Sequence, residues 1–296
     1  MKIKKRNDNK IIYKNHSNLV KFLYNTIIGR CFLKLLINKY ISKLGGFFLN
    51  SKLSIFIKNK VIRHNNIDMS IYEDIEYNNY NKFFTRKLKR EYLNINQDKN
   101  ILISPCDSKL TILRINEHNS FKIKNSIYKL EEIINDPIIN EYKNGYLLIF
   151  RLEVDDYHRY CFIDDGKINK YQYIKGKFHT VQPIVYDHYK VFHQNTREWT
   201  ILKTNNFDNI IQVEVGALLV GKIVNNKKIN SFNKGDEKGY FEFGGSTILL
   251  FIKDNIINFD QDILDNSKNN IETIVKYGEK IGVKKNGWNW KIKNRN

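Results

Sequence analysis

The first 65 residues carry most of the chain's positive charge and are also rich in apolar side chains. They hold fifteen Lys and Arg residues against a single acid, Asp8, which accounts for +14 of the formal net charge of +19. Leu, Ile, Phe and Val recur between these charges every three or four residues, over residues 19–44 and again over 47–62. This spacing predicts amphipathic helices, with Gly45-Gly46 ending the first of them. We therefore assign residues 1–66 to a basic, amphipathic helical region, whose apolar faces need a surface to cover them.

An anionic membrane is the surface that such a region fits best. A basic amphipathic helix is typical of a segment that lies in the membrane interface, and no apolar run reaches the length of about 18 residues that spans a bilayer. The alternative is that the helices pack on their own domain and the charges are merely solvated. We expect no nucleic-acid partner, because no recognition module accompanies the charge. Three scattered cysteines (Cys31, Cys106 and Cys161) are too few for a disulfide framework, which indicates a reducing compartment.

After about residue 100 the pattern changes to short apolar runs separated by turn residues, which is typical of β-strands. The predicted strands are 101–103, 109–115, 146–152, 160–163, 166–173, 201–204, 210–215, 218–224, 239–243 and 247–252. Residues 127–134 fit a short helix that ends before Pro137, and residues 271–276 fit either a strand or a helix. The chain lacks the spacings of a phosphate-binding loop and of a metal site. It therefore predicts an α+β fold, with the helical region packed on or beside a mostly β domain at 100–296, and a connecting segment at 67–99.

The sequence Gly244-Gly245-Ser246-Thr247 lies between two predicted strands. By itself it is typical of a tight turn. It also suits a bond that the protein breaks itself, because Gly245 has no Cβ and its carbonyl can be approached closely by the Ser246 hydroxyl. A hydroxyl is a poor nucleophile until a base takes its proton, so this interpretation requires a histidine and an orienting acid elsewhere.

Two residues supply candidates for these roles. Asp107 lies in Ser104-Pro105-Cys106-Asp107, directly after the predicted strand at 101–103, and His158 follows the strand-like run at 147–154. Taken alone, Asp107 is typical of a turn and His158 of a strand edge. Their occurrence together with the Gly-Ser-Thr sequence makes the catalytic interpretation the stronger one.

Taken together, these motifs resemble the phosphatidylserine decarboxylase family, whose members are pyruvoyl-dependent enzymes of phospholipid synthesis. The resemblance is carried by Phe83-Phe84-Thr85-Arg86-Lys87-Leu88, Ser104-Pro105-Cys106-Asp107, Asp156-Tyr157-His158-Arg159, Thr180-Val181-Gln182-Pro183, Asn195-Thr196-Arg197, residues 213–221 and residues 234–251. These ordered blocks run through most of the chain, and the Gly-Ser-Thr block is the most specific of them.

The resemblance implies a proenzyme that cleaves itself between Gly245 and Ser246. Ser246 would attack the Gly245 carbonyl, with a histidine as base and Asp107 orienting it. β-Elimination would then leave chains 1–245 (β) and 246–296 (α), the latter capped by a covalently bound pyruvoyl group derived from Ser246. The ketone would form a Schiff base with the amine of phosphatidylserine, so that CO2 leaves and phosphatidylethanolamine is released.

The resemblance also implies the partners of the chain. These are phosphatidylserine, an anionic phospholipid membrane and the chain's own two fragments, with a peripheral location on the cytoplasmic face of the cell membrane. The oligomeric state is left open, with a homodimer among the options. The alternatives are a decarboxylase of another serine-headed lipid, such as an ether lipid, and a membrane-binding homologue that never matures.

The chain departs from the family at one histidine. The family usually shows His-Arg-x-His in the block at Tyr157, and here Cys161 stands in the second position. A thiol with a pKa near 8.5 is a weaker candidate for the base than an imidazole. We hypothesise that His179, at a place where relatives tend to carry an aromatic residue, replaces the missing base for cleavage while His158 serves decarboxylation. The alternative is that His179 only lines the pocket and His158 does both.

Two arginines are candidates for binding the substrate. Arg86 and Arg197 lie in the quoted blocks, and a guanidinium suits a phosphate or a carboxylate. Each is equally typical of a surface salt bridge.

Overall fold

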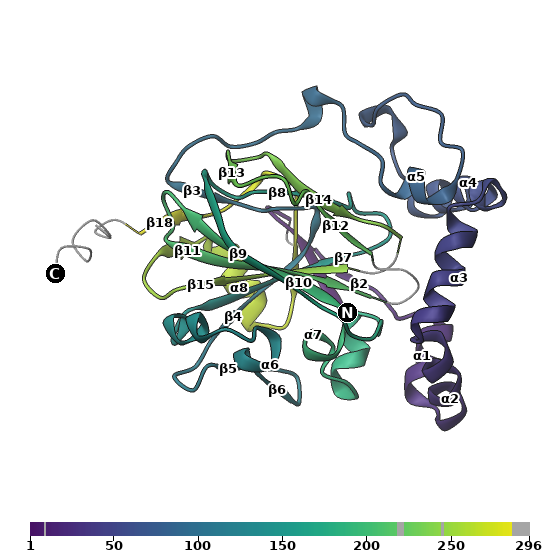
Figure 1. The fold of residues 1–296 in the computed structure, drawn as a ribbon, viewed down its shortest axis with the longest axis horizontal. Helices are drawn as coiled ribbons and strands as arrows, with labels where there is room; N and C mark the ends of the chain where they lie inside the picture. The colour runs from purple at the N-terminus through teal and green to yellow at the C-terminus, as the bar shows by residue number, and fades with distance from the viewer. Residues whose placement is uncertain (9, 218–221, 244–245, 286–296) are drawn as a thin grey trace.

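The structure, a computed structural model, describes residues 1–8, 10–217, 222–243 and 246–285. Its centre is a ten-stranded sheet in the order β13-β9-β10-β11-β15-β7-β4-β17-β1-β2 (Figure 1). Neighbouring strands are antiparallel except β1 and β17, which are parallel. The strands are β1 Lys2–Lys5, β2 Ile11–Tyr13, β4 Ser108–Arg114, β7 Tyr146–Leu152, β9 Gly166–Ile174, β10 Arg197–Thr204, β11 Asn209–Gly216, β13 Ser231–Phe232, β15 Ser246–Ile252 and β17 Glu272–Val275.

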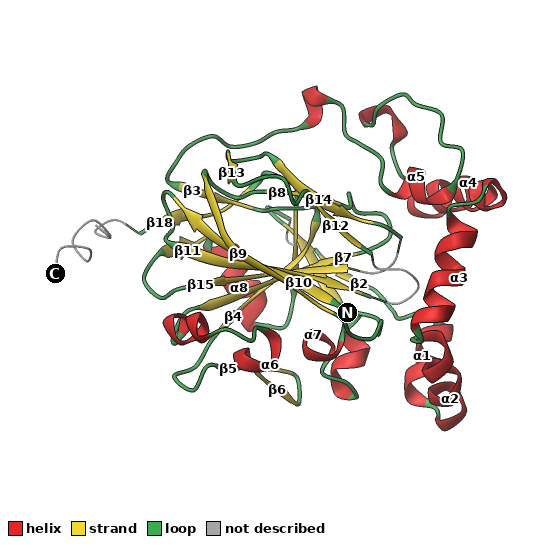
Figure 2. Ribbon diagram, viewed as in Figure 1, coloured by secondary structure: helices red, strands yellow, loops and turns green. Residues whose placement is uncertain are grey.

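Each face of this sheet is covered by a different layer (Figure 2). One face carries two three-stranded sheets, β12-β14-β8 and β16-β18-β3. The other face carries short helices and the β5–β6 hairpin. These elements are β3 Ile101–Ile103, β5 Ser120–Ile123, β6 Ser126–Lys129, β8 Arg159–Cys161, β12 Ile223–Asn225, β14 Glu237–Phe241, β16 Ile257–Phe259, β18 Lys280–Lys284, α6 Leu130–Ile133 and α7 Val191–Gln194. Helix α8 (Gln261–Lys268) packs against β4 and β17.

The buried side chains form a separate core on each face, because successive residues of a strand point to opposite faces. Ile248 and Leu250 of β15 lie in a core with Tyr160 and Phe241, which we call the small-sheet core. Leu249 and Phe251 lie in the opposite core, which we call the helix-side core.

Four helices follow the first hairpin and stand to one side of the sheet in Figure 1: α1 Asn18–Asn25, α2 Ile27–Leu36, α3 Lys39–Leu49 and α4 Ile55–Asn65. Helix α5 (Tyr80–Phe84) comes from the connecting segment and packs against α4. Short 3-10 turns link these and other elements: η1 Lys52–Ser54, η2 Met69–Ile71, η3 Arg90–Tyr92, η4 Pro137–Tyr142 and η5 Pro183–Asp187. No helix of the described ranges is long and apolar enough to cross a membrane.

The predicted α+β class is confirmed, and most predicted strands agree with the structure to within a few residues. Residues 271–276 contain a strand, β17. The helix predicted at 127–134 is wrong in its first half, because residues 126–129 pair with β5 and Tyr128 stacks on Phe121 with ring centres 5.3 Å apart. Of the strand predicted at 218–224, residues 218–221 lie outside the described residues, and β12 begins at Ile223.

Two expectations for the N-terminal region are also wrong. Residues 2–5 and 11–13, assigned to a helical region, are strands, because Ile3 is buried in the large sheet between β17 and β2. Gly45-Gly46 does not end the first helical stretch, since α3 continues through it to Leu49. A glycine costs roughly 1 kcal/mol in a helix interior but does not forbid one, and here the side chain of Asn38 caps the helix by accepting from the Tyr40 N–H.

Arg6 joins the N-terminal strand to the C-terminal part of the chain. Its guanidinium lies 2.7 Å from a carboxylate oxygen of Asp260, 2.9 Å from Asp262 and 3.1 Å from Glu279. Three carboxylates around one partly buried cation are left in mutual repulsion when the cation is removed. The N-terminal residues are thereby fixed to a part of the chain that follows Ser246.

We predict that Arg6→Ala lowers the free energy of unfolding by about 2 kcal/mol, because charge-assisted hydrogen bonds to three carboxylates are lost. Urea unfolding measures the change. Lys10→Ala is the control, since Lys10 is an exposed residue just before β2, and its midpoint is expected to stay at the wild-type value. Equal midpoints for both variants would contradict the prediction.

Candidate active site

Ser246 is the first residue of β15, in the interior of the large sheet. It pairs with Gly216 of β11 on one side and with Leu152 of β7 on the other. Its side chain is fully buried, and among the described residues its Oγ has no hydrogen-bond partner. Gly245, on the other side of the predicted cleavage bond, lies outside the described residues. A buried hydroxyl without a partner is rare and calls for an explanation, which the layer that the hydroxyl faces can supply.

The alternation along β15 decides which layer Ser246 faces. Residues directly opposite each other in a sheet point to the same face, so Ser246 points with Leu152, and with Ile248 two residues on, toward the small-sheet core. Thr247 points to the opposite face together with Val215. Two adjacent buried hydroxyls therefore face different layers.

His158 lies in the layer that Ser246 faces. It immediately precedes β8, its carbonyl accepts from the Phe241 N–H of β14, and its ring lies on Phe84 with centres 3.9 Å apart. Its Nδ1 is 2.8 Å from the main-chain carbonyl of Asp156. A carbonyl only accepts, so Nδ1 carries the proton and Nε2 keeps its lone pair. That Nε2 is buried and has no partner among the described residues.

The His158 ring is neutral and held in place. Burial, aided by the positive charge of Arg86, lowers its pKa well below the usual value. The turn before it is fixed by Lys109, whose Nζ lies 2.7 and 2.9 Å from the two carboxylate oxygens of Asp156. The arrangement provides an uncharged imidazole with a free lone pair, which is what a general base requires.

His179 lies in the other layer. Its ring stacks on Tyr189 with centres 4.2 Å apart and lies 6.3 Å from the ring of Tyr24 in α1. Tyr24 belongs to the helix-side core, and Tyr189 packs against it. Neither ring nitrogen of His179 has a partner among the described residues, so no hydrogen bond fixes its tautomer. The structure thus places His158, and not His179, in the layer that Ser246 faces.

Asp107 is held by two residues that the sequence did not single out. Its carboxylate accepts from Lys276 Nζ at 2.7 Å and from the Tyr277 N–H at 2.8 Å. In the described part of the chain it makes no hydrogen bond with either histidine. Burial raises the pKa of Asp107, although the charge of Lys276 opposes the shift.

Cys161 lies beside the loop that carries Asp107, since its N–H donates to the Pro105 carbonyl at 2.9 Å. Burial raises the pKa of its thiol to about 12, so the thiol is neutral and is a poor base. The second family histidine would stand at this position. With a cysteine there, Lys276 and Tyr277 are the partners of the Asp107 carboxylate, and within the described ranges no hydrogen bond joins Asp107 to a histidine.

The chain was compared with known proteins. The sequence model of the phosphatidylserine decarboxylase family matches residues 80–283, which is more than half of the chain and includes all four predicted catalytic residues. The chain belongs to the phosphatidylserine decarboxylase family. The resemblance seen in the sequence is therefore confirmed, and with it the assignment of the chain to a decarboxylase.

Several relatives match nearly the whole chain. Phosphatidylserine decarboxylase proenzyme 2 of Clostridium acetobutylicum is 53% identical over 272 residues, which cover 91% of this chain and 92% of that protein. The phosphatidylserine decarboxylase proenzyme of Clostridium botulinum (strain Hall) is 44% identical, with 90% and 92% covered. That of Clostridium tetani is 44% identical, with 83% and 85% covered.

In this member of the phosphatidylserine decarboxylase family, the two arginines suggested for substrate binding differ from each other in their hydrogen-bond partners. Arg197 donates to the main-chain carbonyls of Glu132, Ile133, His193 and Asn195, which fixes α6 and α7 to the sheet. The Arg197 guanidinium therefore has a structural role, and we correct its assignment to substrate binding. Arg86 is fully buried, and its Nε and one terminal nitrogen have no partner among the described residues.

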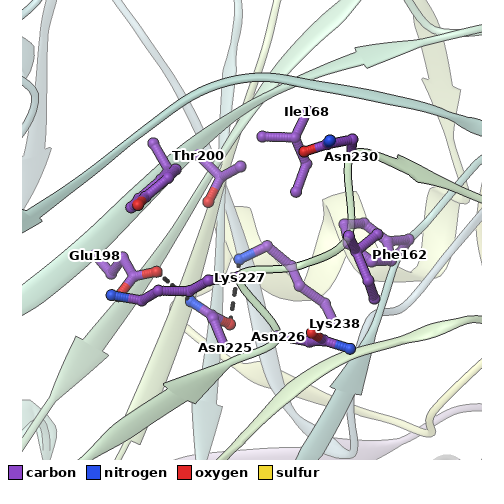
Figure 3. A pocket seen from close by; sticks show the side chains of 11 residues that line it. Phe162, Ile168, Glu198, Thr200, Asn225, Asn226, Lys227, Asn230 and Lys238 are labelled. Carbon is purple, nitrogen blue, oxygen red and sulfur yellow. Dashed lines mark hydrogen bonds between the residues drawn. The ribbon is translucent and has the colours of Figure 1, made fainter.

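A cavity beside β10 holds a polar network that the sequence analysis did not predict (Figure 3). The Asn225 amide donates to Glu198 at 2.9 Å and to Glu214 at 3.1 Å. Glu214 also accepts from Lys238 Nζ at 2.7 Å. The half-buried Asn225 and the buried Glu198, Glu214 and Lys238 join β12 and β14 to β10 and β11, and so fix the layer that carries His158.

His179 gives the phosphatidylserine decarboxylase fold a measurable sensitivity to acid. Burial lowers its pKa to about 4, whereas an unfolded histidine has a pKa of about 6.5. Below pH 6.5 His179 binds a proton in the unfolded chain but stays neutral in the folded chain. The contribution of His179 to the free energy of unfolding is therefore complete above pH 6.5 and is lost between pH 6.5 and 4. The loss is about 3 kcal/mol.

The comparison of wild type with His179→Phe measures this loss, because phenylalanine keeps the stack on Tyr189 and does not titrate. Urea unfolding at pH 4, 5, 6 and 7 should show the wild type losing about 3 kcal/mol relative to the variant as the pH falls. His158 is present in both proteins, so its contribution cancels. Parallel stability curves would contradict the prediction.

Proposed function

We propose that the chain is a phosphatidylserine decarboxylase proenzyme that cleaves itself between Gly245 and Ser246 and keeps a pyruvoyl group made from Ser246. The observation that supports this most is the buried, unpartnered Ser246 hydroxyl at the start of an interior strand, facing the layer that holds a neutral His158 with a free Nε2. Membership of a family whose named relatives are proenzymes supports it independently.

The self-cleavage needs only groups of this chain and one water molecule. His158 Nε2 takes the Ser246 hydroxyl proton as Oγ bonds to the Gly245 carbonyl carbon. The bond from that carbon to the Ser246 nitrogen then breaks, the nitrogen receives the proton from His158, and an ester is left. Loss of the Ser246 Cα proton expels the Gly245 carboxylate and leaves a dehydroalanine. Addition of water releases ammonia and leaves the ketone.

Once formed, the ketone supplies an electron sink for the amine of the substrate, so that CO2 can leave. The protein contributes the position of this group. Because Ser246 lies between β11 and β7, the new terminus is held on both sides by hydrogen-bonded strands. The contacts of Arg6 with Asp260 and of Asp107 with Lys276 keep fragments 1–245 and 246–296 together after the cut.

Arg86 fits the role of meeting the negative charge of the substrate. A buried guanidinium without a carboxylate partner is costly, and among the described residues no acid forms an ion pair with Arg86. Its charge acts on the His158 ring, and its terminal nitrogen donates to the Asp155 carbonyl at 3.1 Å. An anionic substrate at this place would supply the missing counter-charge.

We assign the surface formed by α1–α4 to contact with an anionic bilayer on the cytoplasmic face of the cell membrane. Residues 18–65 hold nine Lys and Arg and no acid. Large apolar side chains are exposed between these charges: Leu19, Phe22, Ile27, Ile28, Phe32, Leu35, Ile41, Leu44, Phe47, Phe48, Leu53 and Phe56. Exposed apolar side chains bracketed by cations match an interface of acyl chains and anionic headgroups, and the proposed substrate lies in that interface.

The exposed face of α2 offers a direct test of this contact. Ile27 and Ile28 are 75% and 65% exposed, so replacing both with serine costs the fold little but removes apolar area from the interface. We predict that binding to vesicles that contain phosphatidylserine falls at least tenfold, as measured by flotation. Lys2→Ala is the control, since it removes an exposed cation outside the surface. Undiminished flotation of the double variant would argue for a different contact surface.

Intact mass of the purified protein tests the proposed function. The expected result is two fragments, 1–245 and 246–296, the second with a ketone in place of an amino terminus, together with conversion of phosphatidylserine in vesicles to phosphatidylethanolamine. A single uncut, inactive chain would identify a membrane-binding homologue that does not mature.

A further inference from the structure

The α1–α2 hairpin has an exposed outer face and an inner face that packs on the helix-side core. Most of its large apolar side chains point away from the protein. The side chains that contact the helix-side core are the buried Leu23, Tyr24 and Leu33 and the partly buried Val20 and Leu36, and we call these residues the anchors of the hairpin. A restraint on the outer face can reach the β domain through these anchors. Tyr24 is the one anchor that also carries a polar group.

Tyr24 is fully buried against the segment that follows β9. Its hydroxyl accepts from the Thr180 N–H at 3.0 Å, and its ring meets Tyr189 edge-on at 5.9 Å between centres. The same segment carries His179, whose ring stacks on that of Tyr189 at 4.2 Å and lies 6.3 Å from that of Tyr24, so the three rings form one aromatic group. Hence the position of residues 179–180 depends on Tyr24.

The contact continues from residues 179–180 to the strand pair that holds Ser246. The side-chain carbonyl of Asn195 accepts from the His179 N–H at 3.0 Å, and its amide donates to the His179 carbonyl at 2.8 Å. The same amide donates to the Gly216 carbonyl, also at 2.8 Å. Gly216 is the residue of β11 that pairs with Ser246. Asn195 is fully buried, so it joins these segments without water.

We propose that Tyr24 is a positioning residue that couples engagement of the α1–α2 hairpin with a lipid surface to the place of Ser246, through Thr180, Asn195 and Gly216. This inference rests on the proposed function, because Ser246 is the origin of the ketone. Docking of the outer face restrains the hairpin, and the hydrogen bonds carry that restraint to the strand end. Turnover of lipid in a membrane should thus exceed turnover of the same headgroup free in solution.

The test compares two forms of the substrate on the mature enzyme. One is phosphatidylserine in anionic vesicles, and the other is dihexanoyl phosphatidylserine below its critical micelle concentration. For the wild type we expect kcat on vesicles to exceed kcat on the monomeric lipid about tenfold, a common size for coupling between sites. Tyr24→Leu removes both ring and hydroxyl, and should bring the ratio of the two kcat values close to one.

The ratio separates coupling from a loss of structure, because a merely structural defect lowers both kcat values together. Tyr24→Phe keeps the ring and removes only the acceptor for the Thr180 N–H, so it covers the case in which Tyr24→Leu fails to fold, and an intermediate ratio is expected. Tyr13→Leu, at a tyrosine that is 72% exposed, is the matched control and should keep the wild-type ratio. A wild-type ratio in both Tyr24 variants overturns the coupling. A wild type without product from either lipid overturns the proposed function instead.

Discussion

Ser246→Ala is expected to leave the chain in one piece and without decarboxylase activity. Without the hydroxyl no ester can form with Gly245, and without the ester no ketone is made. The fold should survive, because the Ser246 side chain makes no hydrogen bond among the described residues and alanine occupies nearly the same volume. Intact mass should show residues 1–296 unbroken, and conversion of phosphatidylserine should fall by at least about 10³-fold, since the electron sink itself is missing.

Thr247→Val is the matched control for this result. Thr247 is also fully buried, and its hydroxyl also lacks a partner in the described part of the chain. It points to the opposite face of the sheet, away from the layer of His158, so valine should be cut at the wild-type rate. Cleavage of Ser246→Ala, or failure of Thr247→Val to be cut, would show that the wrong hydroxyl has been assigned.

The parts of the fold that the sequence predicted well are those encoded by local pattern. The short apolar run at 146–152 predicts a strand, and β7 has the same limits in the structure. Gly235 lies between the strands predicted at 218–224 and 239–243, and its φ of +88° is a turn conformation that suits glycine. Ser246, the serine proposed for cleavage, can be recognised in the sequence because its motif lies within a few consecutive residues.

The parts that escaped prediction depend on contacts between distant residues. β1 is a strand because it pairs with β17, about 270 residues further along the chain, and nothing local in Lys-Ile-Lys-Lys marks a strand. The partners of Asp107 are likewise distant, since Lys276 and Tyr277 belong to no recognisable motif. The division of the two histidines between the layers follows from the register of β15 with β7 and β11, which no single segment of sequence contains.

That division leads to the second large expected effect. His158→Gln should slow self-cleavage by a factor of about 10² to 10⁴, the usual contribution of a general base, because glutamine keeps polar contact with the Asp156 carbonyl but cannot take a proton. His179→Phe should be cut at the wild-type rate. The fraction of uncut chain over time after synthesis, read on a denaturing gel, measures both variants.

This pair of variants decides between the two roles that the sequence allowed for His179. Ser246 shares its layer with His158, whose tautomer is fixed with Nε2 free, whereas His179 stacks among tyrosines on the other side of the sheet. Both rings are buried and neutral, so these properties do not distinguish the two histidines. A base must reach the proton that it removes, so their positions relative to Ser246 favour His158 as the base. If His179→Phe stays uncut while His158→Gln is processed, then His179 has taken the place of the histidine missing at Cys161, and the chain must rearrange before it cleaves to bring that ring to Ser246.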